Sequence, residues 1–561
     1  MTDAKISEKK SEVIARDWQS IDWCKNNHIV RDLRHRIYRA SRQGNRRKVR
    51  SLQRLMLKCT ANRELSIRKV TQQNKGRNTA GVDGKTVTTA AERSQLMVEL
   101  STYEPWKAQP VKRVFIPKAN GKQRPLGIPT ILDRSMQAVV KNALEPEWEA
   151  QQEPCSYGFR PGRSCHDAIA RIYLISRPNK NKKWVVDADV TGAFDNIQHE
   201  TVLDALRGFP GKRLIKAWLK AGIMQKQKWS QTEIGTPQGG VISPLLLNIA
   251  LHGMEQAVGV KWRKHKHTSN LQGPRALVRY ADDFIIFAES EADAHQAKAD
   301  ITHWLQERGL TLNEEKTRIT HLKDGFNFLG FNVRHYPVTN TKTGWKLLIK
   351  PTPEAVHSFI HRLKQEWRAL VGQNADRVVS KLNPILRGWG NYFRIGISQE
   401  IFTGIDNWMF QRECRWINHT HPNKGNRWKR KTYFGRRAEG RNDHWVFGGE
   451  QYYVLKLRWI PIQRHQMVVF DYSPDNPDLA RYWNKRNQRK TYRLPTRRQR
   501  ALAKRQQGRC PHCHDSLHND EELQTHHIIP QAKGGQDIMR NLELVHRDCH
   551  RQKHYKAMHS A

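Results

Sequence analysis

The sequence predicts a multidomain α+β protein, and three observations on its pattern lead to this prediction. A chain of 561 residues is too long to fold around one hydrophobic core. Up to about residue 350, strand-like and helical patterns follow one another, which favours a sheet with helices packed against it. From 353 to about 420 the apolar spacing is helical, and the last fifty residues form a Cys/His-rich module.

The charge balance indicates a nucleic-acid partner. The chain carries a formal charge of +45 and has a pI near 10.2, so it repels itself unless a polyanion neutralises it. Its 18 Trp, 16 Phe and 14 Tyr argue against a disordered chain. We find no apolar run of membrane-spanning length and no secretory signal. Eight scattered Cys favour a reducing compartment over a disulfide scaffold.

Residues 1–70 are expected to form a basic helical extension. Leu33 and Ile37 lie one helical turn apart, and basic side chains fill the positions between the apolar ones. One face of such a helix can pack while the other meets phosphates. A merely solvated face is the alternative, but the lack of acidic residues between 33 and 54 favours RNA.

Several strands and hairpins are predicted between residues 111 and 333. A basic hairpin (111–116 and 126–128, turning at Asn120-Gly121) has a shape suited to covering phosphates. Residues 184–190 read as a buried strand that carries Asp187 and Asp189, and the clearest hairpin spans 276–288 with a tight turn through Asp282-Asp283. The other expected elements are helices at 130–152 and 291–308 and a single short strand at 326–333.

Three aspartates are candidate metal ligands. Phosphoryl transfer from a nucleoside triphosphate uses two divalent ions about 4 Å apart, and Mg²⁺ prefers carboxylate oxygens. Asp189 at a strand end and Asp282-Asp283 at a neighbouring hairpin tip could converge on such a pair. For the dipeptide alone, an ordinary turn is the alternative. We expect Asp187 to point to the opposite face of its strand from Asp189, and Asp195 to be structural.

The order of several motifs resembles the fingers and palm of reverse transcriptases. The palm motifs are Asp189-Val-Thr-Gly-Ala-Phe-Asp-Asn-Ile197, Thr236-Pro-Gln-Gly-Gly-Val-Ile-Ser-Pro-Leu245 and Tyr280-Ala-Asp-Asp283. Ile116-Pro-Lys118 and Arg124-Pro-Leu-Gly-Ile-Pro129 resemble the fingers, and Gly309-Leu-Thr-Leu-Asn-Glu-Glu-Lys-Thr317 and Phe328-Leu-Gly-Phe331 follow the palm. The resemblance implies a right-hand polymerase with fingers and an antiparallel palm sheet over 71–350.

The same resemblance implies roles for individual residues. Asp189, Asp282 and Asp283 would hold two Mg²⁺ ions. Phe194 would lie under the sugar and exclude a ribose 2′-hydroxyl, and Gln238 would contact the incoming dNTP. Lys118 and Arg124 would hold the triphosphate, and Lys316 is a candidate proton donor to pyrophosphate. The bland alternatives are a core Phe194 and surface cations.

Two further segments resemble the proteins encoded by mobile group II introns: Leu386-Arg-Gly-Trp-Gly-Asn-Tyr-Phe-Arg394 and Thr79-Ala-Gly-Val-Asp83. The resemblance implies an α-helical thumb or maturase domain over 351–420 that grips intron RNA. Aromatic and cationic side chains there can stack on bases and neutralise phosphates, although an ordinary packed helix pair is the alternative. Residues 421–505 are expected to be a basic DNA-binding region, and 485–509 reads as a charged linker.

The last segment, 506–561, contains two sets of metal-ligand residues. Cys510-Pro-His-Cys513 and His546-Arg-Asp-Cys549 suffice for a structural Zn²⁺, with His546 standing where a Cys is often found. The additional His526, His527, Asn541 and His550 resemble an HNH endonuclease with a ββα-metal fold. His527 would be the general base, Asn541 would orient its loop, and His526, His550 and His554 would hold a divalent metal. An inactive or purely DNA-binding zinc module is the alternative.

Together these expectations describe one multifunctional enzyme, an RNA-directed DNA polymerase and maturase that binds a group II intron RNA. It nicks target DNA and copies the RNA, using the new 3′-hydroxyl as primer. The alternatives are a reverse transcriptase of another system, a splicing-only factor with an inactive polymerase, and a protein that is chiefly an endonuclease. The expected site of action is the bacterial cytoplasm, at the nucleoid, with an organelle as the alternative. No membrane partner is expected, and no pattern predicts an oligomeric state.

Overall fold

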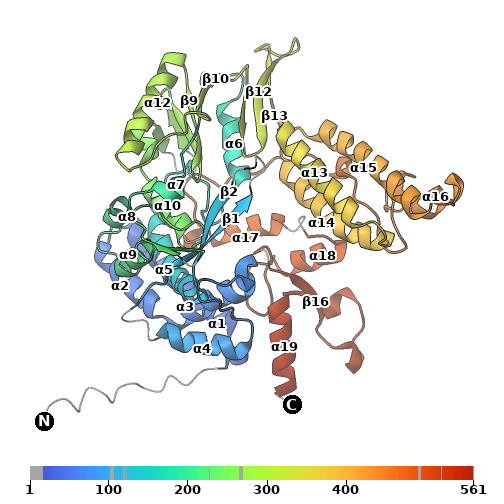
Figure 1. Ribbon diagram of the computed structural model, residues 1–561, viewed down its shortest axis with the longest axis horizontal. Coiled ribbons are helices and arrows are strands. Elements are labelled where there is room, and N and C mark those ends of the chain that lie inside the picture. The colour runs from blue at the N-terminus through green and yellow to red at the C-terminus, as the bar shows by residue number, and fades with distance from the viewer. Residues whose placement is uncertain are drawn as a thin grey trace.

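The computed structural model describes residues 17–101, 106–117, 121, 123–226, 228–264, 269–490, 494–519 and 521–559. A central body carries two arms, one made of helices and one made by the end of the chain (Figure 1). No helix among the described residues combines the length and the apolar content needed to cross a bilayer.

The N-terminal region is a group of helices packed on one long helix. The helices are α1 (Trp23–Arg42), α2 (Arg46–Lys58), α3 (Thr60–Arg68), α4 (Ala90–Ser101) and α5 (Ile131–Glu149). Buried Leu33 and Ile37 of α1 face this core. The predicted helical pattern is therefore confirmed over the described part of 1–70.

A small sheet follows, with strand order β2-β1-β4-β5. Its strands are β1 (Val111–Pro117), β2 (Gln123–Ile128), β4 (Ile223–Gln225) and β5 (Lys228–Ser230). The antiparallel pairing of β1 with β2 confirms the basic hairpin. Lys118 and Asn120, which follow β1 in the sequence, lie outside the described residues.

The central antiparallel sheet has the order β10-β3-β9-β8. Its strands are β3 (Trp184–Asp189), β8 (Ala276–Tyr280), β9 (Asp283–Ala288) and β10 (Arg318–His321). Because side chains alternate along each strand, Val186 joins the core on one face and Val185 joins the core on the other. Helix α12 (Glu291–Gln306) covers the first face and α6 (Cys165–Ile175) the second.

Shorter elements connect these layers: α7 (Ala193–Asn196), α8 (His199–Ala205), α9 (Lys212–Leu219), α10 (Ser243–Ala250), α11 (Met254–Ala257), β6 (Lys261–Lys264) and β7 (Ser269–Gln272). The single strand expected at 326–333 is wrong. The segment forms β11 (Phe326–Phe328) and β12 (Phe331–Pro337), which pair with each other and with β13 (Trp345–Pro351). The turn between them is Leu329-Gly330, whose φ angles are 49° and 77°. Both values suit a two-residue hairpin turn.

The helical arm in yellow and orange confirms the predicted switch to helical spacing (Figure 1). It contains α13 (Pro353–Ala369), α14 (Ala375–Phe393), α15 (Gln399–Thr420) and α16 (Asn426–Tyr433). Trp389 stacks on Phe359 with ring centroids 4.4 Å apart, so this tryptophan is largely a packing residue.

The prediction of a linker over 485–509 is wrong over its described part. Helix α17 (Ala480–Gln488) ends within this range, and α18 (Arg497–Arg505) lies wholly inside it. Upstream lie the short strands β14 (Phe434–Gly435) and β15 (Val446–Phe447). The physical reason is long-range anchoring: buried Asp167 of α6 accepts hydrogen bonds from His465 at 3.0 Å and from Arg486 at 3.0 Å.

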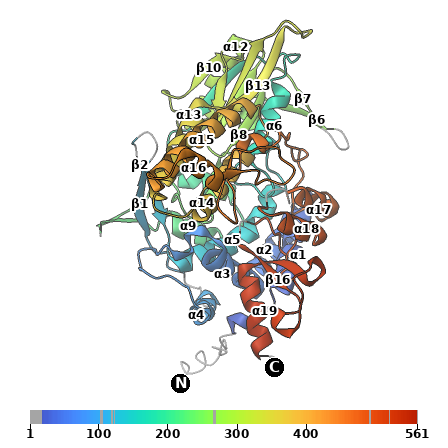
Figure 2. The ribbon, with the colours of Figure 1, turned by 90° about the vertical axis from the view of Figure 1, so that its right-hand side faces the viewer.

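The chain ends with β16 (Leu523–His527), its antiparallel partner β17 (Leu542–His546) and α19 (Arg547–His559). Both ribbon views place α19 beside the N-terminal helices (Figures 1 and 2). Apolar residues of this last segment belong to the same core as α1 and α3. The C-terminal module is therefore packed onto the polymerase-like body.

Candidate active sites and metal centres

The three predicted aspartates meet at one edge of the central sheet. Strand β3 ends at Asp189, and the register pairs this residue with Asp283, the first residue of β9. Tyr280 pairs with Asp283, so the hairpin turn consists of Ala281 and Asp282, one position earlier than expected. Ala281 has a φ of 60°, which fits the first central position of a type II′ turn. A non-glycine residue there carries strain, as active-site turns often do.

The carboxylates of this edge are poorly neutralised. Burial and the charges of Asp282 and Asp189 raise the pKa of Asp283 to about 7, and burial also raises the pKa of Asp282. Lys316 contacts the Asp189 carboxylate, and this hydrogen bond raises the lysine's pKa. Partly buried like charges are costly to hold together, so the site suits divalent cations.

The ligand atoms of the three aspartates are spaced more widely than those of the Cys and His residues near the C-terminus. Among the described residues, ligand atoms all within 4.8 Å of one another occur in two Cys/His clusters and not in this carboxylate set. A wider set can serve two ions about 4 Å apart, each taking part of the carboxylates.

The expectation for Asp187 is wrong. Residues two apart on a strand share a face, so Asp187 lies on the same side of β3 as Asp189. Burial and the Asp189 charge raise its pKa to about 7, against a lowering effect of Arg318. The β10 register places Arg318 opposite Asp187.

Asp195 joins the small sheet to the loop that contains Gln238. Its carboxylate accepts a hydrogen bond from Gln238 Nε2 at 3.2 Å and lies 3.6 Å from Arg113 Nη1 of β1. The half-buried ring of Phe194 makes an edge-to-face contact with the ring of Phe159, with the two ring centroids 6.2 Å apart, and it also packs on the core. Arg124 on β2 is exposed and close enough for its charge to lower the pKa of Asp282.

Sequence reasoning missed the residues that support the Ala281-Asp282 turn. Arg279 is 0% exposed and donates hydrogen bonds to the carbonyl of Ala281 at 3.2 Å and to Asn248 Oδ1 at 3.1 Å. Gly158 lies against the same turn, where an added Cβ would meet Ala281 N at 2.3 Å. A charged residue inside the apolar strand before Tyr280 was the available signal.

The first Cys/His cluster fits a tetrahedral zinc site. Cys510, Cys513, His546 and Cys549 are buried with their ligand atoms within 4.8 Å of one another. His546 Nδ1 lies 3.4 Å from Cys513 Sγ and 3.9 Å from Cys549 Sγ, while its Nε2 lies 3.1 Å from the Ser516 carbonyl. A metal-bound imidazole usually donates its other N–H to such an acceptor, so the residues fit the ion.

The second cluster joins β16 to α19. The ring nitrogens of His526, His550 and His554 lie within 4.8 Å of one another, with the Nε2 atoms of His550 and His554 3.2 Å apart. Burial and the Lys553 charge lower the pKa of His526 to about 4. A neutral imidazole is the form that binds a metal ion.

His527 and Asn541 lie next to this cluster. His527 Nε2 is 3.1 Å from Asp537 Oδ1, a carboxylate that can orient the ring. The Asn541 amide donates to the carbonyls of Ile529 at 3.0 Å and Gln536 at 2.9 Å, and its Oδ1 accepts from Ile529 N–H at 2.8 Å. Asn541 is thus hydrogen-bonded to the loop that follows His527.

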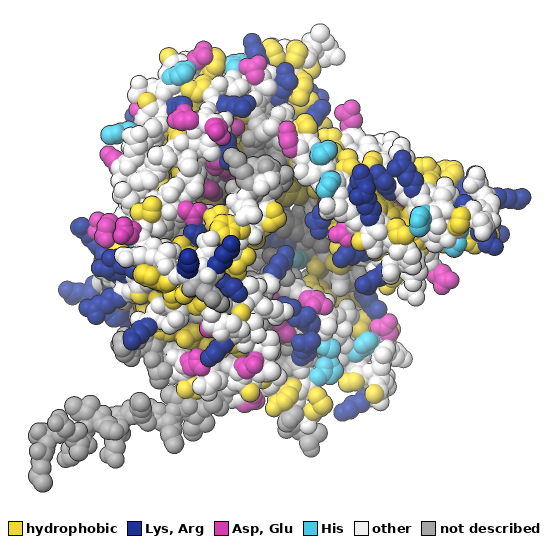
Figure 3. Space-filling view, viewed as in Figure 1, with side chains coloured by type: hydrophobic (Ala, Val, Ile, Leu, Met, Phe, Trp, Pro, Cys, Tyr) yellow, Lys and Arg dark blue, Asp and Glu magenta, His cyan; other side chains and the backbone are white. Residues whose placement is uncertain are grey.

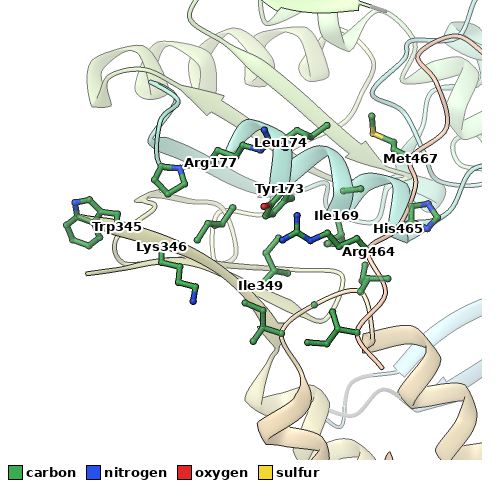
Figure 4. Close-up of a pocket in the computed structure, with 17 residues that line it drawn as sticks. Ile169, Tyr173, Leu174, Arg177, Trp345, Lys346, Ile349, Arg464, His465 and Met467 are labelled. Carbon is green, nitrogen blue, oxygen red and sulfur yellow. The ribbon is translucent and has the colours of Figure 1, made fainter. Parts of the chain in front are cut away.

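A large cavity lies elsewhere and includes none of the predicted site residues. It measures about 620 Å³ and lies between α6, β13 and residues 462–467 (Figure 4). The face shown in Figure 3 instead carries many Lys and Arg side chains, including some on the helical arm. Such an exposed basic surface suits an extended polyanion better than a small molecule.

Comparisons with known protein families divide the chain into four regions. Residues 18–100 match the N-terminal domain of reverse transcriptase, and 116–333 match Reverse transcriptase (RNA-dependent DNA polymerase). Residues 356–434 match the group II intron maturase-specific domain, and 510–556 match HNH endonuclease. All three metal-ligand clusters described above fall inside matched regions.

Whole-protein relatives agree with these matches. Protein YkfC of Escherichia coli K12 is 34% identical in an alignment of 300 positions, and the match covers 47% of this chain and 77% of that protein. The group II intron-encoded protein LtrA of Lactococcus lactis is 30% identical in an alignment of 404 positions, and the match covers 57% of this chain and 66% of LtrA. An uncharacterised 91 kDa protein in the cob intron of Schizosaccharomyces pombe is 27% identical over 52% of this chain and 44% of its own length.

A solved structure of apo telomerase from Candida tropicalis is a distant match, with 16% identity and a TM-score of 0.30 over 40% of this chain and 53% of that chain. The four domain matches follow one another along the chain, and the match to Protein YkfC covers 77% of that bacterial protein. The chain belongs to the group II intron-encoded proteins that combine a reverse transcriptase, a maturase domain and an HNH endonuclease.

Proposed function

We propose that this reverse transcriptase and maturase inserts its intron by nicking target DNA and copying the intron RNA from the new 3′-hydroxyl. The observation that carries the proposal is the meeting of Asp189 and Asp283 across paired strands, beside a strained turn presenting Asp282. These carboxylates would hold two Mg²⁺ ions, which would supply electrostatic stabilisation of the negative charge that develops during phosphoryl transfer.

The remaining polymerase residues bind and select the dNTP. Arg124, and Lys118 by its place in the same motif, hold the triphosphate, while Gln238 contacts the nucleotide from a loop tied to Asp195. Phe194 blocks a 2′-hydroxyl. Lys316, already in contact with Asp189, protonates the leaving pyrophosphate.

The C-terminal module cuts DNA, and a structural zinc ion stabilises its fold. Cys510, Cys513, His546 and Cys549 bind a structural Zn²⁺, whereas His526, His550 and His554 bind the divalent ion of the nuclease. His527 is the general base that activates water, and Asn541 keeps its loop in place. Two antiparallel strands followed by a helix support a ββα-metal assignment.

The chain's regions share this work. The proposed domains are an N-terminal extension (1–70), fingers and palm (71–350), a thumb that binds intron RNA (351–420), a basic region for target DNA (421–505) and the nuclease (506–561). The positive charge and the bacterial relatives support a place at the nucleoid in the cytoplasm.

Separate variants of the two active sites test the proposal. With intron RNA and a DNA target, Asp282→Ala is expected to abolish cDNA synthesis but not nicking. His527→Ala is expected to lower nicking by about 10²-fold or more and to leave extension of a pre-annealed primer intact. Loss of both activities in either variant would contradict separable sites.

A splicing-only protein with an inactive polymerase is the rival reading. It predicts RNA binding without synthesis, so primer extension on poly(rA)/oligo(dT) by the wild-type protein decides between the two. Extension that disappears in Asp282→Ala supports the proposal, and no extension by the wild-type protein refutes it.

A further inference from the structure

The zinc cluster proposed above is covered by the N-terminal helices. Arg68, the last residue of α3, is 2% exposed and donates a hydrogen bond from Nη2 to Cys549 Sγ at 3.1 Å. The same guanidinium lies 3.9 Å from Glu521 Oε2 of the C-terminal module. A residue more than four hundred positions upstream in sequence therefore touches a zinc ligand.

Other contacts surround this one. The Arg68 guanidinium lies over the ring of Trp23 on α1, 4.7 Å from its centroid. Asn27 Nδ2 donates to the carbonyl of Cys513 at 2.9 Å, and Gln552 Nε2 of α19 donates to the carbonyls of Gln19 and Ile21, each at 2.8 Å. The two regions are thus joined by specific buried hydrogen bonds as well as by a shared core.

Charge explains why an arginine stands at this position. A divalent zinc ion with three thiolates and one neutral imidazole carries a net charge of minus one. A buried guanidinium is costly unless an anion accompanies it. Arg68 and the metal–thiolate cluster satisfy this requirement for each other, and Glu521 adds a second anionic partner.

We propose that the metal–thiolate cluster is the point at which the nuclease module docks on the polymerase body, with Arg68 as its counter-charge. The inference rests on the proposed zinc site and extends it: the ion that folds the module also holds it against α1 and α3. Metal occupancy then fixes where the nuclease lies relative to the polymerase active site.

The test compares Arg68→Met and Arg68→Lys with Arg34→Met in the full-length protein. Arg34 is a matched control because it also supplies a largely buried guanidinium to the N-terminal helices, but it pairs with Glu145 at 2.8 Å and Asp475 at 2.7 Å. The readouts are the rate of zinc release to a chromogenic chelator and amide hydrogen exchange in 17–23 and in α19.

Loss of an outer-shell partner typically weakens metal binding 10- to 100-fold. Arg68→Met should therefore release zinc at least about tenfold faster and exchange faster in both segments, and Arg68→Lys should fall between it and wild type. Arg34→Met should release zinc at the wild-type rate. Wild-type release and exchange in Arg68→Met, or an equal effect of Arg34→Met, would overturn the docking role.

A second experiment uses only the wild-type protein. Zinc stripped from the wild-type protein with a chelator should raise amide exchange in 17–23, on the polymerase side of the contact, as well as in α19. Unchanged exchange in 17–23 would refute the coupling. Metal analysis of the purified wild-type protein distinguishes the zinc site from the docking role. Protein that contains no zinc refutes the zinc site itself. Protein that binds zinc but shows unchanged amide exchange after zinc removal refutes only the docking role.

Discussion

Two regions of the molecule each gather three carboxylates beside a lysine, yet they differ in how those charges are balanced. At the edge of the palm sheet, Asp189, Asp282 and Asp283 have Lys316 beside them, in contact with Asp189. Asp282 and Asp283 both have raised pKa values, the latter at about 7, because burial and neighbouring carboxylates disfavour their charged forms. This region is folded but electrostatically incomplete.

The second set lies where α15 of the helical arm meets residues 443–458. Asp443 accepts hydrogen bonds from Lys456 at 2.8 Å and Arg458 at 2.6 Å, and despite partial burial these partners hold its pKa at about 2. Asp406 of α15 accepts the backbone N–H groups of Leu457 and Arg458 at 2.8 and 3.0 Å. Glu413 is 4% exposed, and burial raises its pKa to about 8, so it is neutral at pH 7.

The difference teaches how to separate a catalytic acid cluster from a structural one. In this second set, burial raises the pKa of Asp406, but its carboxylate accepts two backbone N–H groups, and the raised pKa of Glu413 favours its neutral form. Asp443 has two cationic donors. In the palm, the carboxylates converge without enough donors, which leaves them suited to the divalent ions proposed above. Satisfaction of charge, and not the number of acids, identifies the metal site.

The largest expected effect is that of Asp282→Asn on synthesis. Removing one metal ligand forfeits several kcal/mol of transition-state stabilisation, so primer extension should fall at least about 10³-fold. The melting temperature without Mg²⁺ should stay equal or rise because one repelling charge is gone. Extension above a tenth of the wild-type rate would place Asp282 with the structural acids.

Magnesium itself should distinguish the two clusters. At a Mg²⁺ concentration about 100 times the dissociation constant, binding to the folded state stabilises it by about 2.7 kcal/mol. Thermal denaturation should show this gain for wild type and for Asp443→Asn, but a reduced gain for Asp283→Asn. Equal stabilisation of all three proteins by Mg²⁺ would mean that the ion binds outside the palm carboxylates, and would contradict the distinction between the two acid clusters.

The convergence of the three palm aspartates could be predicted from sequence because local pattern places them at strand ends and in a turn. Buried strands and a hairpin place Asp189 and Asp283 in register, and the motif order locates them along the chain. The Asp187 face was predicted wrongly, because strand alternation has a period of two. Arg279 was missed because its partners, Asn248 and the Ala281 carbonyl, depend on tertiary packing.

The segment 421–505 could not be predicted because it has little periodicity of its own. Its loops are fixed by acids on distant helices, as when Asp376 of α14 accepts the backbone N–H of Tyr452 at 2.8 Å. Single long-range contacts of this kind leave no repeat in the sequence, so the pattern predicted only a basic DNA-binding region over 421–505 and a linker over 485–509. The docking role of Arg68 was hidden for the same reason.

Removing the charge of Asp443 should lower the free energy of unfolding without lowering polymerase activity. Asp443→Asn leaves Lys456 and Arg458 without their shared anion, and loss of one partner of a partly buried ion pair costs about 2 kcal/mol. Denaturant unfolding should show a lower midpoint, while extension of an annealed primer at 25 °C stays near wild type. A specific loss of synthesis in a folded Asp443→Asn protein would contradict a structural role.

The smallest effect concerns Glu413 and appears only with pH. Its pKa is raised from 4.5 to about 8 in the folded protein, so its contribution to stability is full below pH 4.5 and is lost as pH rises through 8. Between pH 7 and 9 this loss amounts to about 1 kcal/mol. Glu413→Gln, which cannot ionise, should lose less stability than wild type over this interval in urea unfolding. Parallel pH profiles would show that Glu413 is already charged at pH 7, and therefore that the arm, like the palm, contains an acid still in need of a cation.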